Sequence, residues 1–352
     1  MHRGTRVRGT RGIVPPYLLR HIASLDDERF AVAAQAAQLA LAERPTHDTT
    51  HPSVAPTVGR QPLQRDVHDA AGDTVLPGRL VRSEGQPPSG DVAVDEAYDG
   101  FGATDALYRD VYGRISIDDA GLPLRGTVHY GRAYDNAFWD GNQMVFGDGD
   151  GEIFGRFTAS LSVIGHELTH GVVEYAAGLV YRDQSGALNE SVADVFGALV
   201  EQHAAGQTAD EASWLIGAGL FTDQVQGEAL RSMSAPGTAY DDDVLGRDPQ
   251  PAHMDDFVST TQDNGGVHLN SGIPNKAFHL VATALGGHAW EVAGRIWYDT
   301  LLGDLSPRAT FAEFAQATVK AAEPHDAADA VRSAWQAVGV WSDPTTPSSS
   351  SR

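Results

Sequence analysis

The stretch Val163-Ile164-Gly165-His166-Glu167-Leu168-Thr169-His170 carries the densest chemical information in this 352-residue chain. His166 and His170 are four residues apart inside an apolar run, and on an α-helix that spacing places both imidazoles on one face. Two imidazoles held in this way can share one tetrahedral Zn²⁺. Glu167 follows the first histidine, where it could take a proton from a metal-activated water. Taken alone, the pattern also fits two solvated or core histidines on an amphipathic helix, so other residues must decide.

The composition narrows the classes of function. The chain has 47 acidic and 25 basic residues, a formal net charge of −22, which disfavours binding to nucleic acid or to an anionic membrane. It has no cysteine, so a zinc site would have to use His and carboxylate ligands. It has no run of 18 or more apolar residues, and no transmembrane helix is predicted.

A third metal ligand is expected from another segment, because a catalytic zinc site keeps three protein ligands and one open position. Glu190 lies twenty residues after His170, which leaves room for a turn and a returning helix. Asp194 follows one helical turn later on the same face. There it could accept the second ring N–H of a zinc histidine and fix its orientation. The alternative is a solvated acidic face, which is less attractive beside the His-Glu-x-x-His stretch.

The residue patterns predict a strand-rich first half and a helical second half, and the length favours two lobes. In the first half we expect a hairpin at 74–82, a helix at 95–112, and strands at 126–130 and 143–146. In the second half the predicted helices are 162–177, 187–203, 211–219, 274–285, 289–302, 309–322 and 327–338.

Several short blocks, taken together, resemble the thermolysin family of zinc metalloendopeptidases, and most closely its protealysin-like branch. They follow one another in the family's order over about residues 66–340. The matching blocks are Asn136-Ala137-Phe138-Trp139, Gly147-Asp148-Gly149-Asp150-Gly151, the His-Glu-x-x-His stretch, Tyr181, Asn189-Glu190 with Asp194, Leu230-Arg231-Ser232-Met233, and residues 261–272. The resemblance implies an α+β, two-lobe thermolysin-like fold, with a strand-rich N-terminal lobe, an all-helical C-terminal lobe and the zinc helix at their junction.

The same resemblance suggests a division of the chain. Residues 1–60 would be a short propeptide with the Pro15-Pro16-Tyr17 motif and a linker. Residues 61–177 would be the N-terminal catalytic lobe ending in the zinc helix, residues 178–341 the helical lobe, and residues 342–352 a disordered tail. The simpler alternative for the N-terminus is a disordered basic tail that leads into a helix, because its five arginines are followed by no apolar signal-peptide core.

Roles for individual residues are also implied by the resemblance. His166, His170 and Glu190 would be the zinc ligands and Glu167 the general base. Tyr181 and His268 would donate to the developing oxyanion, with Asp263 orienting His268 and Asp194 orienting a zinc histidine. Residues implied in substrate binding are Asn136 and the Ala137 carbonyl, Arg231 (which would also brace Glu190), and an apolar slot of Phe154, Val163 and Leu230.

The expected activity is that of a zinc-dependent neutral metalloendopeptidase, made as an inactive proprotein. It would hydrolyse peptide bonds on the N-terminal side of bulky hydrophobic residues. Its partners would be protein or peptide substrates and its own propeptide, which would act as an intramolecular inhibitor of a monomeric enzyme. The resemblance implies secretion, although no ordinary signal peptide is visible, and the alternative location is the cytoplasm.

Calcium is where the sequence departs from the family. The paired calcium site of thermolysin needs several acids, and only Glu201 remains in place, with Ser162 where an acid is expected on the zinc helix. We therefore expect the paired site to be lost or reduced to one weak ion. Two other classes of function stay open at this point: a catalytically dead zinc-binding interaction protein, and a calcium-dependent adhesion module, which the missing acids disfavour.

Overall fold

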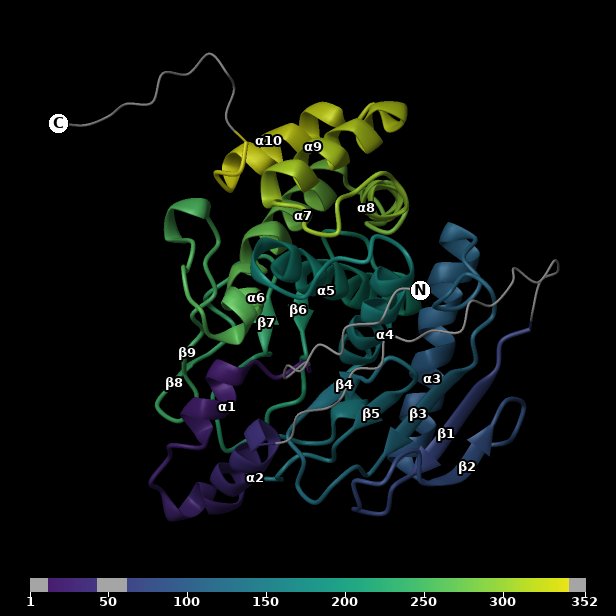
Figure 1. Ribbon diagram of the computed structural model, residues 1–352, viewed down its shortest axis with the longest axis vertical. Helices are drawn as coiled ribbons and strands as arrows, with labels where there is room; N and C mark the ends of the chain where they lie inside the picture. Colours follow the sequence, from purple (N-terminus) through teal and green to yellow (C-terminus); the bar gives the residue numbers. More distant parts are fainter. Residues whose placement is uncertain (1–11, 43–61, 342–352) are drawn as a thin grey trace, which may run out of the picture.

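The computed structural model describes residues 12–42 and 62–341 (Figure 1). Four of the five N-terminal arginines (Arg3, Arg6, Arg8 and Arg11), most of the expected linker and the expected C-terminal tail lie outside the described residues. The described part divides into a strand-rich region, a central pair of helices and a helical region, with an N-terminal helical segment packed against them. Among the described residues, no helix is both long enough and apolar enough to cross a membrane.

The strand-rich region is built on a five-stranded mixed sheet in the order β2-β1-β3-β5-β4. β3 pairs in parallel with both β1 and β5, whereas the two edge strands pair antiparallel with their neighbours. The strands are β1 Arg65–Asp69, β2 Arg79–Ser83, β3 Leu124–Val128, β4 Ala137–Trp139 and β5 Met144–Phe146. The predicted strands near 126–130 and 143–146 are confirmed. The hairpin predicted within 74–82 is wrong in its pairing, because β2 pairs with β1 and residues 74–78 form the connection.

Helix α3 (Val92–Ala106) covers the sheet and continues into a π-helical turn at Leu107–Val111, which confirms the helix predicted at 95–112. The Asp91 side chain accepts the backbone N–H groups of Ala93 and Val94 and so satisfies donors that a helix start leaves unpaired. Phe101 is fully buried and meets Phe146 of β5 with ring centroids 6.3 Å apart. The sheet is therefore tied to the helical layer beside it.

The two central helices, α4 (Leu161–Tyr175) and α5 (Asp183–Ala205), make the most extensive helix–helix contact of the described residues. They cross at two glycines. A Cβ added at Gly197 would clash with the Ser162 carbonyl oxygen, and one added at Gly165 would lie 3.1 Å from the Gly197 Cα. Because neither helix has a side chain at the crossing, their backbones approach closely, and residues on facing turns can converge.

The C-terminal region consists of α6 (Asp263–Asn270), α7 (Gly272–Leu285), α8 (Ala293–Leu302), α9 (Phe311–Ala322) and α10 (Ala328–Ala337). α7 to α10 match the predicted helices, whereas α6 was not predicted. Two short strand pairs also occur here: β6 (Leu215–Ile216) with β7 (Arg231–Ser232), and β8 (Asp241–Asp242) with β9 (Gly246–Arg247). The helix predicted at 211–219 is wrong. Trp214, Gly217 and Gly219 all have positive φ, and the segment pairs as β6 instead.

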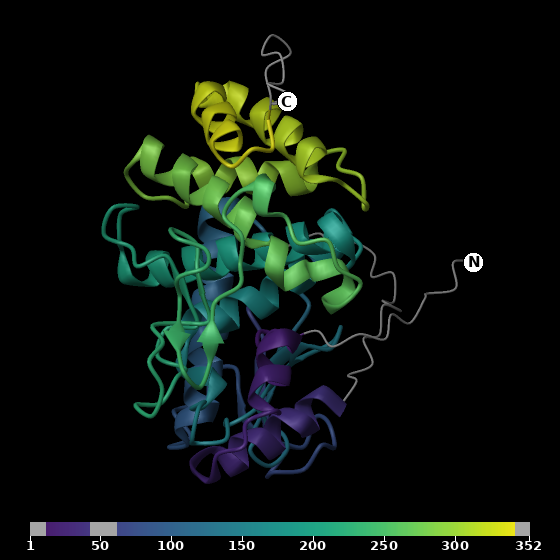
Figure 2. The ribbon, with the colours of Figure 1, turned by 90° about the vertical axis from the view of Figure 1, so that its left-hand side faces the viewer.

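The N-terminal segment, which we call the leader (residues 12–42), folds as α1 (Pro16–Ile22), a 3-10 turn at Glu28–Phe30 and α2 (Ala31–Ala42). Figure 2 shows it in purple against the side of the molecule. Its apolar side chains Leu18, Leu19, Ile22 and Phe30 are at most 2% exposed. The described residues contain the helix into which a basic tail would lead, whereas Arg3, Arg6, Arg8 and Arg11 lie outside them, so that alternative stays open.

Candidate active site

The predicted zinc ligands come together between α4 and α5. The Nε2 atoms of His166 and His170 are 3.0 Å apart. The Glu190 carboxylate of α5 lies 3.6 Å from the first of these nitrogens and 3.4 Å from the second. Among the described residues, this is the one group of three or more His, Asp or Glu residues whose ligand atoms all lie within 4.8 Å of one another.

The hydrogen bonds of the two imidazoles show that the group fits a zinc ion. His166 Nδ1 lies 2.8 Å from the Asp194 carboxylate, and His170 Nδ1 lies 2.7 Å from the Asn189 side-chain oxygen. Because these oxygens accept hydrogen bonds, each Nδ1 atom carries the ring proton. The lone pairs of the two Nε2 atoms are therefore free and face one another. Two nitrogens bound to one tetrahedral Zn²⁺ would be about 3.3 Å apart, close to the observed separation. Glu190 adds a buried oxygen, Oε2, that has no hydrogen-bond partner.

Glu190 is suited to stay ionised in this group. Burial opposes its ionisation, but His268 and, after it, the two ligand histidines and Arg231 lower its pKa to about 2. A carboxylate that remains charged at every physiological pH is a dependable metal ligand. Asn189 was not given a role from the sequence, although it directly precedes Glu190; its side-chain N–H donates to the Leu179 carbonyl 3.1 Å away, which leaves its oxygen for His170.

Glu167 is fully buried on α4 beside the zinc ligands. One carboxyl oxygen accepts the backbone N–H of Trp139 in β4 at 3.0 Å, and the other has no hydrogen-bond partner. Burial, followed by the charge of Glu190, raises the pKa of Glu167 well above its ordinary value. The Trp139 N–H was not recognised from the sequence as part of the site. This N–H binds one carboxyl oxygen of Glu167 and leaves the other oxygen able to exchange a proton.

His268 and Tyr181 approach from the opposite side. The Tyr181 hydroxyl donates to Glu190 and lies 3.2 Å from His268 Nε2. His268 Nδ1 lies 2.6 Å from Asp263, which also accepts the His268 backbone N–H at 2.9 Å. Burial opposes protonation of His268, but Asp263 and Glu190 outweigh it and raise its pKa to about 9. His268 is therefore an imidazolium that can donate from Nε2.

Asp194 and Arg231 form a buried pair behind the histidines. The guanidinium of Arg231 donates from Nε and Nη2 to the two Asp194 oxygens at 2.9 and 2.8 Å. Asn275 of α7 donates to the same carboxylate at 2.8 Å. Arg231 therefore braces Asp194 directly, and the expected bracing of Glu190 is limited to its electrostatic effect on that carboxylate. The pair of β6 with β7 places Arg231 here, which the predicted helix at 211–219 would not have done.

The backbone of leader residues 12–14 occupies the groove beside this group. Ile13 N–H donates to the Ala137 carbonyl at 3.0 Å, and the Ile13 carbonyl accepts from Arg231 Nη1 at 2.9 Å. Val14 N–H donates to the Asn136 side-chain oxygen at 3.0 Å, and the Asn136 amide lies 3.4 Å from the Val14 carbonyl. The Gly12 carbonyl oxygen lies 3.2 Å from His268 Nε2. Asn136, Ala137 and Arg231 thus hold a peptide backbone.

The residues predicted for the apolar slot are all buried. Phe154 stacks on Phe221 with centroids 5.4 Å apart and lies against Phe157 at 5.7 Å; Val163 and Leu230 are at most 1% exposed. Ile13 is likewise fully buried. One helical turn before His166 on α4, the Ser162 hydroxyl accepts the Gly217 N–H at 3.2 Å and lies 3.1 Å from Ser160. The reduced calcium site stays a prediction.

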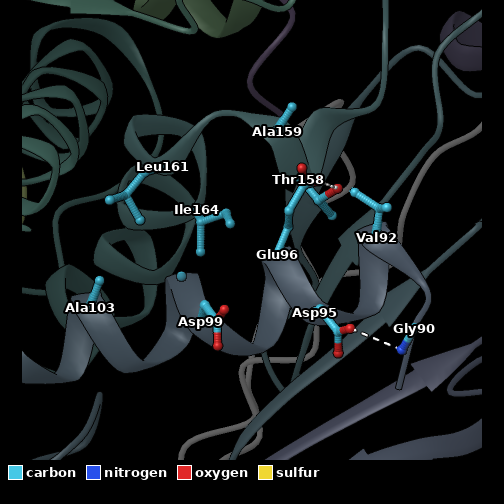
Figure 3. A pocket seen from close by; sticks show the side chains of 11 residues that line it. Gly90, Val92, Asp95, Glu96, Asp99, Ala103, Thr158, Ala159, Leu161 and Ile164 are labelled. Carbon is cyan, nitrogen blue, oxygen red and sulfur yellow. Dashed lines mark hydrogen bonds between the residues drawn. The ribbon is translucent and has the colours of Figure 1, made fainter. Parts of the chain in front are cut away.

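A separate pocket of about 500 Å³ lies between α3 and the start of α4 (Figure 3). Asp95 and Glu96 line it on α3, and Leu161 and Ile164 line it on α4. The Asp95 carboxylate accepts the Gly90 N–H at 3.1 Å, and Glu96 is bound by Arg156 at 2.6 Å. No residue of the zinc group lines this pocket, so it is distinct from the groove that the leader occupies.

Comparison with known proteins identifies the family of this chain. Residues 64–174 match the model of the thermolysin metallopeptidase catalytic domain, and residues 177–340 match its alpha-helical domain. An extracellular metalloprotease of Pectobacterium carotovorum is 54% identical over 335 residues, covering 93% of this chain and 96% of that protein. Thermolysin of Alicyclobacillus acidocaldarius is 41% identical over 288 residues, covering 78% of this chain and 50% of that protein.

A solved structure agrees with these sequence matches. The precursor of protealysin, a metalloproteinase from Serratia proteamaculans, superposes with a TM-score of 0.87 and 53% sequence identity. The match covers 94% of this chain and all of that chain. The fold class predicted from the sequence is confirmed, with short strand pairs added to the helical lobe. This chain belongs to the thermolysin metallopeptidase family, in its protealysin-like branch.

Proposed function

We propose that this chain is a zinc endopeptidase precursor whose leader occupies the substrate groove as a peptide substrate would. The observation that carries this proposal is the run Gly12-Ile13-Val14. Its backbone is held by Asn136, Ala137 and Arg231, and its Gly12 carbonyl faces His268. A groove that binds peptide through main-chain atoms beside a metal-ligand group is what peptide-bond hydrolysis requires. Division of the chain near residue 60 into propeptide and enzyme belongs to the same proposal.

We propose the following roles for the residues of the site. A bound Zn²⁺ would supply an acidified water and polarise the substrate carbonyl. Glu167 takes a proton from the attacking water on its unpartnered oxygen and delivers it to the leaving nitrogen. His268, kept protonated by Asp263, donates to the carbonyl oxygen as charge develops there, together with the Tyr181 hydroxyl. Removing one donor of this kind typically costs about 10²–10³ in rate.

The position of Ile13 supports the proposed specificity. Its side chain comes directly after the carbonyl that faces His268, so it stands where the residue after the cleaved bond would stand. It is fully buried, as are Phe154, Val163 and Leu230, which we propose line the slot. Cleavage is therefore expected on the N-terminal side of bulky apolar residues. A library digestion that showed a preference for charged residues at this position would contradict the assignment.

The activity and the latency can be tested together. Casein hydrolysis should be low for the full chain, rise after the segment 43–61 is cut and the leader is removed, and vanish with a zinc chelator. Equal activity before and after leader removal would refute inhibition by the leader. Zinc binding without hydrolysis in either form would favour the catalytically dead interaction protein instead.

Two further proposals concern where the protein acts and its oligomeric state. We propose secretion, because relatives of this chain from Pectobacterium and Serratia are named extracellular proteases. We also propose that the enzyme acts as a monomer on protein or peptide substrates, without nucleic acid or membrane partners, in keeping with the net charge of −22. Detection of the mature protein only inside the native host would contradict secretion.

A further inference from the structure

One fully buried acid, Asp135, has no place in the proposed reaction. It directly precedes Asn136 in the substrate groove, yet it is 0% exposed, and the group that approaches its carboxyl oxygens is another acid, Asp150. An unpaired buried carboxylate is costly. Burial, and then the charge of Asp150, raises the pKa of Asp135 well above its ordinary value. A buried polar group of this kind calls for an explanation, and an ion that binds there is one.

The neighbouring acid comes from the Gly-Asp loop, residues 147–151. This loop is fastened to the segment that contains Asp135, because Gly147 N–H donates to the Asn136 carbonyl at 3.0 Å and Gly149 N–H to the Tyr134 carbonyl at 3.3 Å. One Asp150 oxygen accepts the backbone N–H groups of residues 152 and 153, both at 2.6 Å. The other oxygen is buried without a partner. Asp135 and Asp150 thus offer uncommitted oxygens on two segments that are tied together.

A third carboxylate, Glu152, is held by the leader. Its Oε2 accepts the backbone N–H of Ala33 at 2.9 Å, in the first turn of α2. First-turn N–H groups have no partner within a helix, and a helix start carries partial positive charge. Glu152 also contributes to the raised pKa of Asp135, so the two lie near each other. Among the described residues only the zinc group gathers three such ligand atoms within 4.8 Å; Glu152 is not gathered with the other two while it caps α2.

We propose that Asp135, Asp150 and Glu152 form a binding site for one Ca²⁺ ion that fills as the leader departs. The donors are all hard carboxylate oxygens, which Ca²⁺ accepts in flexible geometry. In the precursor, the start of α2 is the positive partner of Glu152. When α2 leaves, Glu152 is released to join the two buried acids, and the cation takes over the positive role. This site is separate from the thermolysin paired site around Glu201.

The proposal has a thermodynamic consequence. If Ca²⁺ and α2 compete for Glu152, then Ca²⁺ must weaken docking of the leader by the same factor by which the leader weakens Ca²⁺ binding. The site also adjoins Asn136 and Ala137, which hold the leader backbone. Calcium would therefore favour the departure of the inhibitor and stiffen the substrate groove in one event.

Calcium binding can be tested on the full chain carrying Glu167→Gln, so that the result does not depend on proteolysis. Calorimetric titration with Ca²⁺ should show one binding event that Asp135→Asn and Glu152→Gln each weaken at least about tenfold. The amide introduced by Glu152→Gln keeps an oxygen for the Ala33 N–H. The control is Asp148→Asn, which makes the same charge change in the same loop but removes an exposed carboxylate bound to His129. It should leave the event unchanged.

The competition needs its own measurement. Ala33→Pro removes the N–H that holds Glu152, in the first turn of α2; it should tighten Ca²⁺ binding several-fold, whereas Ala31→Pro should not. Hydrogen exchange of the Ala33 amide in the Glu167→Gln chain should accelerate with Ca²⁺, and Glu152→Gln should abolish the effect. Absence of binding at millimolar Ca²⁺ in both this chain and its Ala33→Pro variant, or equal binding in the Asp135 and Glu152 variants, would overturn the proposal.

Discussion

The zinc group and the leader-filled groove lie side by side but are built on opposite principles. The zinc group uses side chains at fixed positions: two imidazoles one helical turn apart and a carboxylate on the facing helix. The groove uses main-chain atoms of Gly12, Ile13 and Val14 against Ala137, Asn136 and Arg231. The zinc group selects an ion through the types and positions of its ligand atoms. The groove binds a peptide through its backbone, which depends little on the peptide's sequence.

This difference bears on the proposed inhibition by the leader. If a substrate backbone makes the contacts that the leader makes, then what would set the leader apart as an inhibitor is the part C-terminal to Val14. That part is the packing of α1 and α2, whose residues Leu18, Leu19, Ile22 and Phe30 are buried against the body. The contacts in the groove determine where the leader binds, and the packing of α1 and α2 provides its affinity. Substitutions can therefore act on one side of this division at a time.

The largest effect is expected for Glu167→Gln on the side of the zinc group. Loss of the proton acceptor should lower kcat for peptide hydrolysis by about 10²–10⁴. Zinc content should not change, since the three ligands and their hydrogen bonds remain. The variant is checked by peptide hydrolysis together with metal analysis after dialysis. Hydrolysis at the parental rate would remove Glu167 from the proposed mechanism.

A smaller effect is expected for Asn189→Ala, which removes the oxygen that faces His170 Nδ1. A partner that fixes the tautomer of a metal ligand is typically worth about 10–100-fold in metal affinity. Zinc should therefore be lost to a competing chelator at lower chelator concentration. Ser191→Ala is the matched control, because this buried hydroxyl on the same helix has no hydrogen-bond partner. Equal affinity in both variants would show that Asn189 only caps the Leu179 carbonyl.

On the groove side, Gly12→Ala tests recognition by backbone. A Cβ at Gly12 would lie 2.6 Å from the Asn136 side-chain oxygen and 2.9 Å from the Ala137 carbonyl, so the leader would have to shift. Residual activity of the uncut full chain should rise by about tenfold, a loss of about 1.4 kcal/mol of docking. Once the leader is removed, parent and variant should be identical. Ser24→Ala, in an exposed part of the leader, should have no effect.

The smallest effect is a pH dependence of stability that arises on α7. Burial, with a contribution from Lys276, lowers the pKa of His279 to about 4. Since an unfolded histidine has a pKa near 6.5, the unfolded state gains a proton first as pH falls, and the protein loses stability between about pH 6.5 and pH 4. His279→Gln should flatten this part of the curve of Tm against pH, whereas the exposed His325→Gln should not. An unchanged slope would contradict the assignment.

The sequence was most informative where function rests on side chains at regular spacing. The helical repeat of His166, His170, Glu190 and Asp194 predicted two facing helices and their ligands, and the structure brings all four together. The contact of Trp139 N–H with Glu167 could not be predicted, because every residue except proline has such a group and only the fold aims it. The same holds for the leader's backbone bonds.

The wrong helix at 211–219 has a related cause. Its composition suits a helix, but Leu215 and Ile216 pair with residues fifteen or more positions away, and no local pattern reports such a pairing. This difference matters for function, because the strand pair holds Arg231 against both Asp194 and Ile13. The two glycines at 217 and 219 were the available signal, because both adopt positive φ.

The glycine crossing of α4 and α5 gives the metal group a property that its ligands do not have. Because Gly165 and Gly197 let the backbones touch, the distance between the histidines and Glu190 is set by main chain rather than by rotamers. Redesigning this enzyme for an ion of different radius would thus begin at the crossing: Gly197→Ala should widen the cage while every ligand is retained. The selectivity of the site among metals would then depend on the spacing between α4 and α5.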